Sequence, residues 1–380
     1  MRRRVLIPVG GLAAAVVLAG TVAVSGWANA GTTAAPSAAP SAALTKADII
    51  ATMKKVDDYW VAHGTDLKAN NWKNATFHVG NLAFVTAGGV SNHVTRPWAQ
   101  ANKFALPKDK RGPFFPDTYA PGEAYLDLLA FHPDETTLKA LRAQLKAQVA
   151  DVGKGHVSTW NYVDALNMAM PEFARIGVKD KSEATLAAMQ KLFNYTEKVA
   201  GGKGLFSEAA GLWWRDGKYV NSTTFWSRGN GWAAMAMAKV LQALPAGDPR
   251  RGEYQRVLTK MVAKLATIQR PDGFWNVNLG DPNDFPGPET TGTAMFTYAI
   301  TWAINNGILP ADTYRPVVEK AWTGMVTKAV QSSGLLGFCQ STGQRPSDGQ
   351  PVRSTSVTAV GVGAFLLAGS QLAILEAPPA

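Results

Sequence analysis

The sequence is poor in cysteine, and this scarcity excludes one common way of stabilising a fold. Cys339 is the only cysteine in the 380 residues. No internal disulfide can form, although the N-terminus predicts export, so the folded domain must be held together by packing alone. No base lies beside Cys339 in the sequence, and we therefore expect it to be a small buried apolar residue rather than a nucleophile.

The sequence also lacks the common signatures of metal and nucleotide sites. Its 5 histidines show neither HxH nor HExxH spacing. It contains no GxSxG motif, no Walker loop and no GxGxxG ahead of a strand. We therefore expect neither a metal nor a cofactor.

Charge is sparse and only mildly positive. Charged residues make up 17% of the chain, and the formal net charge is +10. No basic run is interleaved with aromatic residues, so we expect no nucleic-acid partner, and no protein partner is evident either. Losing Arg2, Arg3 and Arg4 with a signal peptide would leave 10 − 3 = +7. Such a balance suits an acidic soluble substrate.

The first 30 residues are typical of a secretory signal peptide. Three arginines precede an uncharged apolar run at 5–24, and Ala28-Asn29-Ala30 fits the small-x-small rule for cleavage after Ala30. A Pro/Ala/Ser linker then covers 31–44 and leads to a catalytic domain at 45–376. We expect a secreted protein. The alternative is an uncleaved membrane anchor, because the apolar run is long enough to span a bilayer.

Helical periodicity dominates the rest of the chain. Residues 46–62 and 252–269 each place their apolar side chains on one face. Similar segments occur at 75–88, 119–131, 135–151, 161–177, 183–200, 230–243, 290–306, 311–330 and 355–373. Strand-like alternation is scarce, so the predicted fold class is all-α.

The spacing of these segments predicts helical hairpins stacked in a closed ring, with an open solenoid as the alternative. Long loops at 104–118, 201–229 and 270–289 carry the unusual residues. In a double ring the inner helices bury both faces, and loops at one end form a bowl. The segment 159–177 is apolar nearly all round and fits an inner helix.

Asp164 is the first candidate for chemistry. It lies in "WNYVDALNMAMPEF", among aromatic and aliphatic residues. Apolar surroundings disfavour the charged carboxylate and raise its pKa, which allows proton donation near neutral pH. The alternative is an aspartate that caps the following helix.

Asp117, in "FFPDTYAPGEAYLDLL", is the second candidate. It precedes a helix start at Pro121 and lies close to Glu123 in the sequence. The alternative is again a turn or capping aspartate. Asp127 follows Glu123 at helical spacing and is expected to lie on a solvated or packed face.

The stretch "FWSRGNGW" combines a cation, two indole rings and two glycines at a helix start. Arg228 offers a planar fork of donors that can grip a carboxylate, and Trp226 and Trp232 could stack on a sugar ring. Gly229 and Gly231 would let a ligand approach the backbone. This cluster favours an anionic sugar. A structural Arg–Trp stack and tryptophans buried in the core are the alternatives.

These stretches together resemble glycoside hydrolase family 105 and its relative family 88, the unsaturated uronyl hydrolases. The resemblance covers residues 46–373, and "GLWWRDGKYVNSTTFWSRGNGWAAMA" is its most specific part. Further matching segments are "NNWKNATFHVGNLAF", "PDTYAPGEAYLDLL", "YVDALNMAMPEFARIG", "QRPDGFWNVNLGDP" and "GPETTGTAMFTYAI". The resemblance implies an (α/α)6 barrel of six helical hairpins.

The resemblance also implies a reaction: removal of a 4,5-unsaturated uronic acid from the non-reducing end of lyase-generated acidic oligosaccharides such as unsaturated rhamnogalacturonan. Asp164 would be the general acid/base that protonates C4, and Asp117 would assist it or position the sugar and water. Arg228 would bind the uronate. The remaining expected substrate-binding residues are Trp226, Trp232, Trp214, Trp160 and Trp72.

The sequence departs from the family pattern ahead of the arginine segment. Some members carry a histidine there, whereas this chain has Trp213, Trp214, Arg215 and Asp216. The second sugar is therefore left open. Two other hypotheses are kept: an inverting glycosidase acting on saturated polysaccharide, and a carbohydrate-binding protein without activity.

Overall fold

The computed structural model describes residues 44–88 and 94–377. Within these ranges no helix is long and apolar enough to cross a membrane. The predicted signal peptide and all but the last residue of the predicted linker lie outside the described residues.

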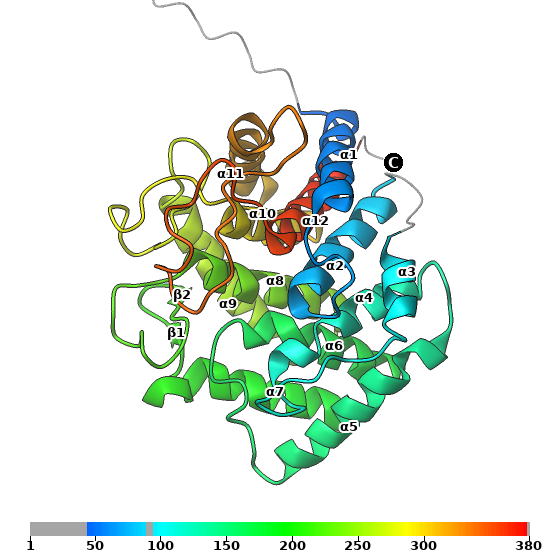
Figure 1. The fold of residues 1–380 in the computed structure, drawn as a ribbon. Coiled ribbons are helices and arrows are strands. Elements are labelled where there is room, and N and C mark those ends of the chain that lie inside the picture. The colour runs from blue at the N-terminus through cyan, green and yellow to red at the C-terminus, as the bar shows by residue number, and fades with distance from the viewer. Residues whose placement is uncertain (1–43, 89–93, 378–380) are drawn as a thin grey trace, which may run out of the picture. The chain divides into compact units, whose positions relative to one another are not determined.

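Twelve α-helices in the described part form two concentric rings (Figure 1). The inner helices are α2 (Trp72–Thr86), α4 (Pro121–Leu128), α6 (Ala165–Lys179), α8 (Ser227–Ala243), α10 (Thr290–Asn305) and α12 (Ala359–Leu375). Each packs against the next, and α12 packs against α2, so the inner ring closes. The predicted all-α ring of hairpins is confirmed, and the open solenoid is excluded.

The outer helices are α1 (Lys46–His63), α3 (Thr95–Ala101), α5 (Lys139–Gly153), α7 (Glu183–Lys198), α9 (Arg251–Thr267) and α11 (Ala311–Gly324). They cover the inner ring, with α7 against α6, α9 against α8, α11 against α10 and α1 against α12. A π-helical turn, Met325–Ala329, extends α11. Three 3-10 turns, Pro116–Thr118, Glu135–Leu138 and Ala200–Gly202, and the hairpin β1 (Phe206–Ser207) and β2 (Leu212–Trp213) complete the elements.

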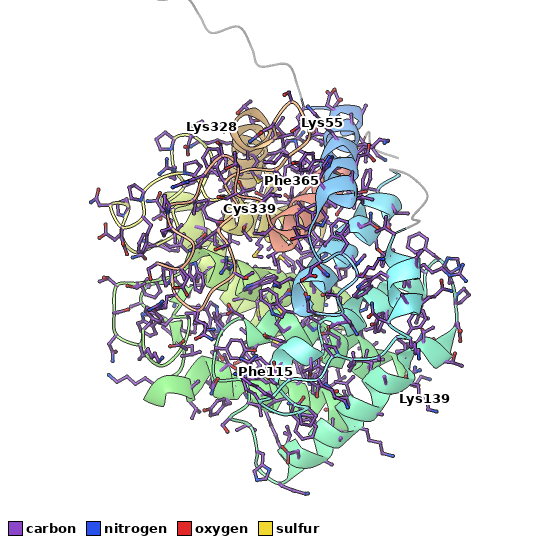
Figure 2. All side chains as sticks on the ribbon, in the orientation of Figure 1. Lys55, Phe115, Lys139, Lys328, Cys339 and Phe365 are labelled. Atoms are coloured by element: carbon purple, nitrogen blue, oxygen red, sulfur yellow. The ribbon has the colours of Figure 1, made fainter. Side chains whose placement is uncertain are left out.

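Burial separates the two rings. All residues from Ser227 to Leu241 in α8, and from Thr290 to Ile304 in α10, are buried. The outer α9 buries one face only, as its apolar periodicity predicts. Cys339 is buried and unpaired in this core, as predicted, and burial raises the pKa of its thiol (Figure 2).

The structure departs from the sequence prediction in several places. Helices α5, α6 and α12 each begin four residues later than predicted, at Lys139, Ala165 and Ala359. Helix α8 begins at Ser227 rather than at 230, because its first turn is anchored by the Ser227 amide, which donates to the Val277 carbonyl at 2.7 Å. The short helix α3 was not expected. The chain between Val330 and Thr358 is a further long loop, which the periodicity did not single out.

The seam between α2 and α12 depends on two glycines. A Cβ atom on Gly80 would lie 2.2 Å from the carbonyl oxygen of Gly363, and one on Gly363 would lie 2.2 Å from the carbonyl oxygen of Thr76. Because both obstacles are backbone, Gly80→Ala must push two inner helices apart. We expect it to lower the free energy of unfolding by about 2–3 kcal/mol.

Thermal and urea unfolding would measure this loss. Gly153→Ala is the matched control, since nothing lies within 4 Å of a Cβ added at Gly153 near the end of α5. Equal stability of the two variants would contradict the close approach at the seam.

Candidate active site

A cavity of about 1060 Å³ opens where the inner helices begin. Asp164 is the residue before α6, Arg228 lies in the first turn of α8, and Trp72 is the first residue of α2. Asp117 lies in the 3-10 turn that precedes α4, and Trp232 lies one turn into α8. The ring therefore brings residues separated by more than 150 positions to one cavity.

Asp164 faces the cavity without capping its helix. Its side chain makes no capping hydrogen bond, which removes the capping alternative. Oδ2 lies 3.6 Å from Nε of Arg215, and a Cβ atom on Gly229 would lie 3.6 Å from Oδ1. Burial raises the pKa of Asp164, and the cations Arg215 and Arg228 oppose that rise. A raised pKa favours the protonated form of the carboxyl group, which is the form that can donate a proton.

Asp117 is the second carboxyl group of the cavity. Its Oδ1 accepts a hydrogen bond from the Tyr162 hydroxyl at 2.7 Å, and its Oδ2 lies 3.9 Å from the Arg111 guanidinium. Burial is the main cause that raises the pKa of Asp117 to about 6, and the charge of Asp164 adds to it. Tyr162 is stacked on Phe115 with ring centroids 5.4 Å apart. The hydroxyl group that holds Asp117 therefore belongs to a ring that is itself held by stacking.

Arg228 is buried and aimed by two distant carbonyl groups. Its Nη1 donates to the backbone oxygens of Gln340 at 3.0 Å and Ser341 at 2.9 Å. Its guanidinium carbon lies 4.5 Å from the centre of the Trp226 ring, and Trp226 Nε1 donates to Gln340 Oε1 at 2.9 Å. No carboxylate among the described residues lies within ion-pairing distance of Arg228. Its charge is therefore available to an anionic ligand.

Arg215 was not among the residues expected to bind substrate. Its Nη1 donates to Asp216 Oδ2 at 2.5 Å, and its buried Nε has no hydrogen-bond partner in the described structure. The Val163 amide donates to the Arg215 carbonyl at 2.8 Å, which fixes the segment after β2 against the start of α6. Arg215 and Arg228 therefore flank Asp164. The departure from the family pattern was a signal that could have identified Arg215.

The tryptophans expected to contact substrate fall into two groups. Trp72 and Trp232 line the cavity, with their ring centroids 6.2 Å apart and nearly perpendicular. Trp226 lies beneath Arg228, Trp160 is fully buried against Phe173, and Trp214 is stacked on Phe225. These last three are not among the residues that line the cavity.

Gly229 and Gly231 serve helix packing rather than an approach by ligand. A Cβ atom on Gly229 would lie 3.0 Å from Val163, and one on Gly231 would lie 2.7 Å from the sulfur of Met295. The glycines let α6 and α10 approach α8 closely. The first of them also brings Asp164 against the start of α8.

Comparison with known proteins places this architecture among carbohydrate-cleaving enzymes. Residues 47–375 match the model of Glycosyl Hydrolase Family 88, and the chain belongs to this family. The predicted relationship to the family 88 and 105 group is therefore confirmed, and membership of a glycosyl hydrolase family supports the expected glycosidase class.

Three relatives illustrate the match. An unsaturated 3S-rhamnoglycuronyl hydrolase from Alteromonas sp. (strain LOR) is 31% identical over 271 residues, which cover 68% of this chain and 62% of that protein. A family 88 glycosyl hydrolase structure from Bacteroides vulgatus has 32% identity and a TM-score of 0.79, covering 87% of this chain and 99% of that one. A polysaccharide lyase structure has 30% identity and a TM-score of 0.80, covering 88% and 99%.

Proposed function

We propose that the protein removes a 4,5-unsaturated uronic acid from the non-reducing end of acidic oligosaccharides produced by lyases. The observation that carries this proposal is Asp164, a protonatable carboxyl group flanked by Arg215 and Arg228 in one cavity. A proton donor beside two cations suits a substrate that carries a carboxylate next to the atom to be protonated. Membership of family 88 and the activity named for the Alteromonas relative support it.

In the proposed reaction, Asp164 protonates C4 of the vinyl ether, and positive charge develops at C5. The Asp164 carboxylate then takes a proton from water, whose oxygen bonds to C5. The resulting hemiketal opens to a ketone at C5 and leaves a hemiacetal at C1. Collapse of this hemiacetal to an aldehyde breaks the bond from C1 to the glycosidic oxygen, which takes up the hydroxyl proton, and releases the remaining saccharide. Asp117 and Tyr162 are placed to position the sugar or the water, and Arg228 binds the uronate carboxylate with Trp232 and Trp72 lining its subsite.

A lyase reaction is the second candidate, because a structure of similar identity and coverage belongs to a polysaccharide lyase. A lyase would remove the proton from C5 of a saturated uronate and expel the group at C4, which creates the double bond instead of consuming it. The same arginines would neutralise the uronate carboxylate.

Ultraviolet absorbance separates the two reactions. The conjugated unsaturated acid absorbs near ~235 nm, so the proposed hydration makes the absorbance fall when an unsaturated disaccharide is the substrate. A rise on a saturated uronate-containing oligosaccharide would establish the lyase instead. Release of sugars from saturated polymer without an absorbance change would indicate an ordinary glycosidase. Saccharide binding with neither sugar release nor an absorbance change would indicate a binding protein without activity.

The charges around Asp164 predict opposite pH shifts for two variants. Arg215 lowers the pKa of Asp164 and Asp216 raises it. If protonated Asp164 is the active form, kcat/KM falls as pH rises through this pKa. Arg215→Met should therefore raise the pH at which kcat/KM falls, and Asp216→Asn should lower that pH.

A pH profile of kcat/KM for the wild type and both variants measures these shifts. Arg142→Met is the control, because it removes a distant surface cation paired with Asp180. It should leave the pH at which kcat/KM falls unchanged. Shifts of the same sign in the two cavity variants would contradict the role of Asp164 as the acid.

Export is also a proposal, supported by Arg2 to Arg4, the apolar run that follows and the Ala28–Ala30 site. N-terminal sequencing of the protein recovered from the culture medium tests it. A first residue of Gly31 is the expected result, and recovery of the intact N-terminus in the membrane fraction would indicate an anchor.

A further inference from the structure

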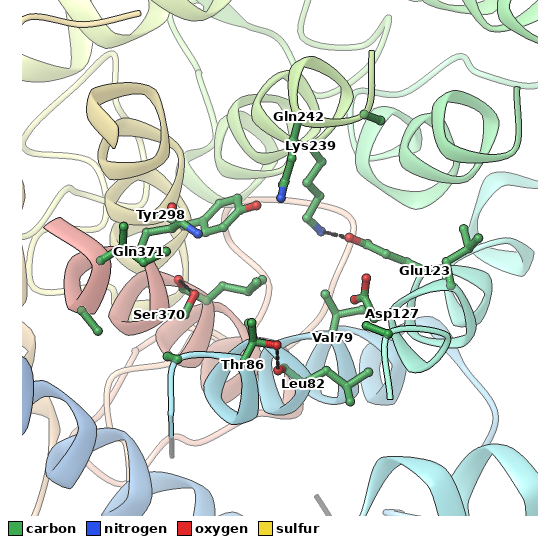
Figure 3. Close-up of a pocket in the computed structure, with 18 of the residues that line it drawn as sticks. Val79, Leu82, Thr86, Glu123, Asp127, Lys239, Gln242, Tyr298, Ser370 and Gln371 are labelled. Atoms are coloured by element: carbon green, nitrogen blue, oxygen red, sulfur yellow. Dashed lines mark hydrogen bonds and ion pairs between the residues drawn. The ribbon is translucent and has the colours of Figure 1, made fainter. Parts of the chain in front are cut away.

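A second cavity, of about 440 Å³, lies at the other end of the inner ring (Figure 3). Asp164 and Arg228 stand where α6 and α8 begin, whereas Arg175 and Lys239 lie in the last two turns of the same helices. The remaining lining comes mainly from α2, α4 and α12, with Tyr298 contributed by α10. This cavity is therefore separate from the candidate active site, and nothing in the proposed reaction uses it.

The inner end of this cavity holds charges that already balance one another. Lys239 Nζ lies 2.8 Å from Oε1 and 2.9 Å from Oε2 of Glu123, and both side chains are buried. Arg175 Nη1 donates to Asp127 Oδ1 at 2.6 Å. An ionic ligand would have to displace one of these partners and leave a buried charge unpaired, which is costly. The cavity is therefore better suited to an uncharged ligand.

Several polar groups nevertheless face the cavity with free hydrogen-bonding capacity. Tyr298 is only 4% exposed, and its hydroxyl has no hydrogen-bond partner among the described residues. Burial raises the pKa of Tyr298, so the hydroxyl keeps its proton. Lys239 has three N–H donors and directs two at Glu123. Figure 3 shows Tyr298, Gln242 and Lys239 directed toward the same space.

The other walls combine apolar side chains with polar ones, the latter being Lys46, Thr86, Ser370 and Gln371. Val79 and Leu82 of α2, Leu126 of α4 and Leu367 of α12 line the cavity. Its rim includes Phe131 and Ile374, which are two of the three large hydrophobic residues exposed in the described structure. The lining therefore alternates polar groups with hydrocarbon. Such a lining matches a ligand with hydroxyl groups along its edge and C–H groups on its faces.

We propose that this cavity is a binding site for a neutral saccharide of one or two sugar units. Its volume lies within the range of about 300–1,000 Å³ that is common for small-molecule sites. Hydroxyl groups can both donate and accept, so they satisfy the Tyr298 hydroxyl, the Gln242 amide and the third Lys239 donor without disturbing either ion pair. This proposal does not depend on the proposed reaction, because the two cavities share no lining residue.

Isothermal titration calorimetry on the full chain tests the site with rhamnose, galactose, glucose, xylose and lactose, and with glucosamine as the charged control, since glucuronate would also enter the candidate active site. We expect one or more neutral sugars to bind with a Kd of about 1 mM or tighter and the charged sugar to bind at least tenfold more weakly. Tyr298→Phe should weaken the neutral sugar about tenfold, since it removes one buried hydrogen bond and no contact to protein.

Two further variants locate the binding. Ala83→Leu fills the cavity from α2 and should abolish binding, whereas Arg228→Lys alters the other cavity and should leave it unchanged. The proposal is overturned if no neutral sugar binds at about 10 mM, a concentration at which even weak sites fill. It is equally overturned if binding survives both Tyr298→Phe and Ala83→Leu, is lost in Arg228→Lys, or favours a charged sugar.

Discussion

Asp164→Asn should lower kcat/KM on an unsaturated disaccharide by about three to four orders of magnitude. Asparagine has nearly the same shape as aspartate but can neither deliver a proton to C4 nor accept one from water. The side chain makes no capping hydrogen bond, so its helix has little to lose in the exchange. The measurement is the rate of absorbance loss near ~235 nm, beside a thermal unfolding curve.

Asp58→Asn is the matched control, because Asp58 is exposed on α1 and pairs only with Lys54 on the same helix. It should keep full activity. Activity of a folded Asp164→Asn protein within tenfold of the wild type would remove Asp164 from the reaction. Asp117, the other carboxyl group of the cavity, would then become the leading acid.

Arg228→Lys should lower kcat/KM by about a hundred- to a thousandfold, mostly through KM. Lysine keeps the charge but has no planar fork, so it cannot hold the Gln340 and Ser341 carbonyls and a substrate carboxylate together. Steady-state kinetics of this variant against substrate concentration gives KM and kcat separately.

The same variant distinguishes ligand binding from a structural Arg–Trp stack. Arg142→Lys on the surface is the control and should change neither kinetic constant. If Arg228→Lys lowers only the unfolding temperature and leaves KM unaltered, the guanidinium supports Trp226 and the loop beyond Val330 and does not bind substrate.

The outer helices were predictable because they bury apolar stripes at a period near 3.6 residues, and inner helices such as α8 and α10 are buried on all sides. The start of α8 was placed three residues late, since Gly229 and Gly231 disfavour a helix locally and only packing against Val163 and Met295 overrides that preference. Helix α3 has 7 residues and includes a proline, so it is too short for any periodicity to emerge.

Asp164, Asp117 and Arg228 could be identified because each stands out from its neighbours in the sequence. Tyr162 could not be placed in the same way, and the departure from the family pattern marked Arg215 without giving it a role. Both roles arise only when the segment after β2 folds back on the start of α6. Indole rings are also ambiguous, because tryptophans that line a cavity and tryptophans buried elsewhere have similar neighbours in the sequence. Only the folded structure shows that Trp72 and Trp232 line the cavity and that the other three do not.

The bonds that orient Arg228 cannot form until late in synthesis. Gln340 and Ser341 follow Arg228 by 112 and 113 residues. A ribosome that has finished Arg228 needs on the order of ten seconds to supply them. Until then the nascent chain contains Asp117, Asp164 and Arg228, but the Arg228 guanidinium lacks the two carbonyl groups that orient it. A chain released before this loop is made would therefore lack an oriented guanidinium at the proposed anion site.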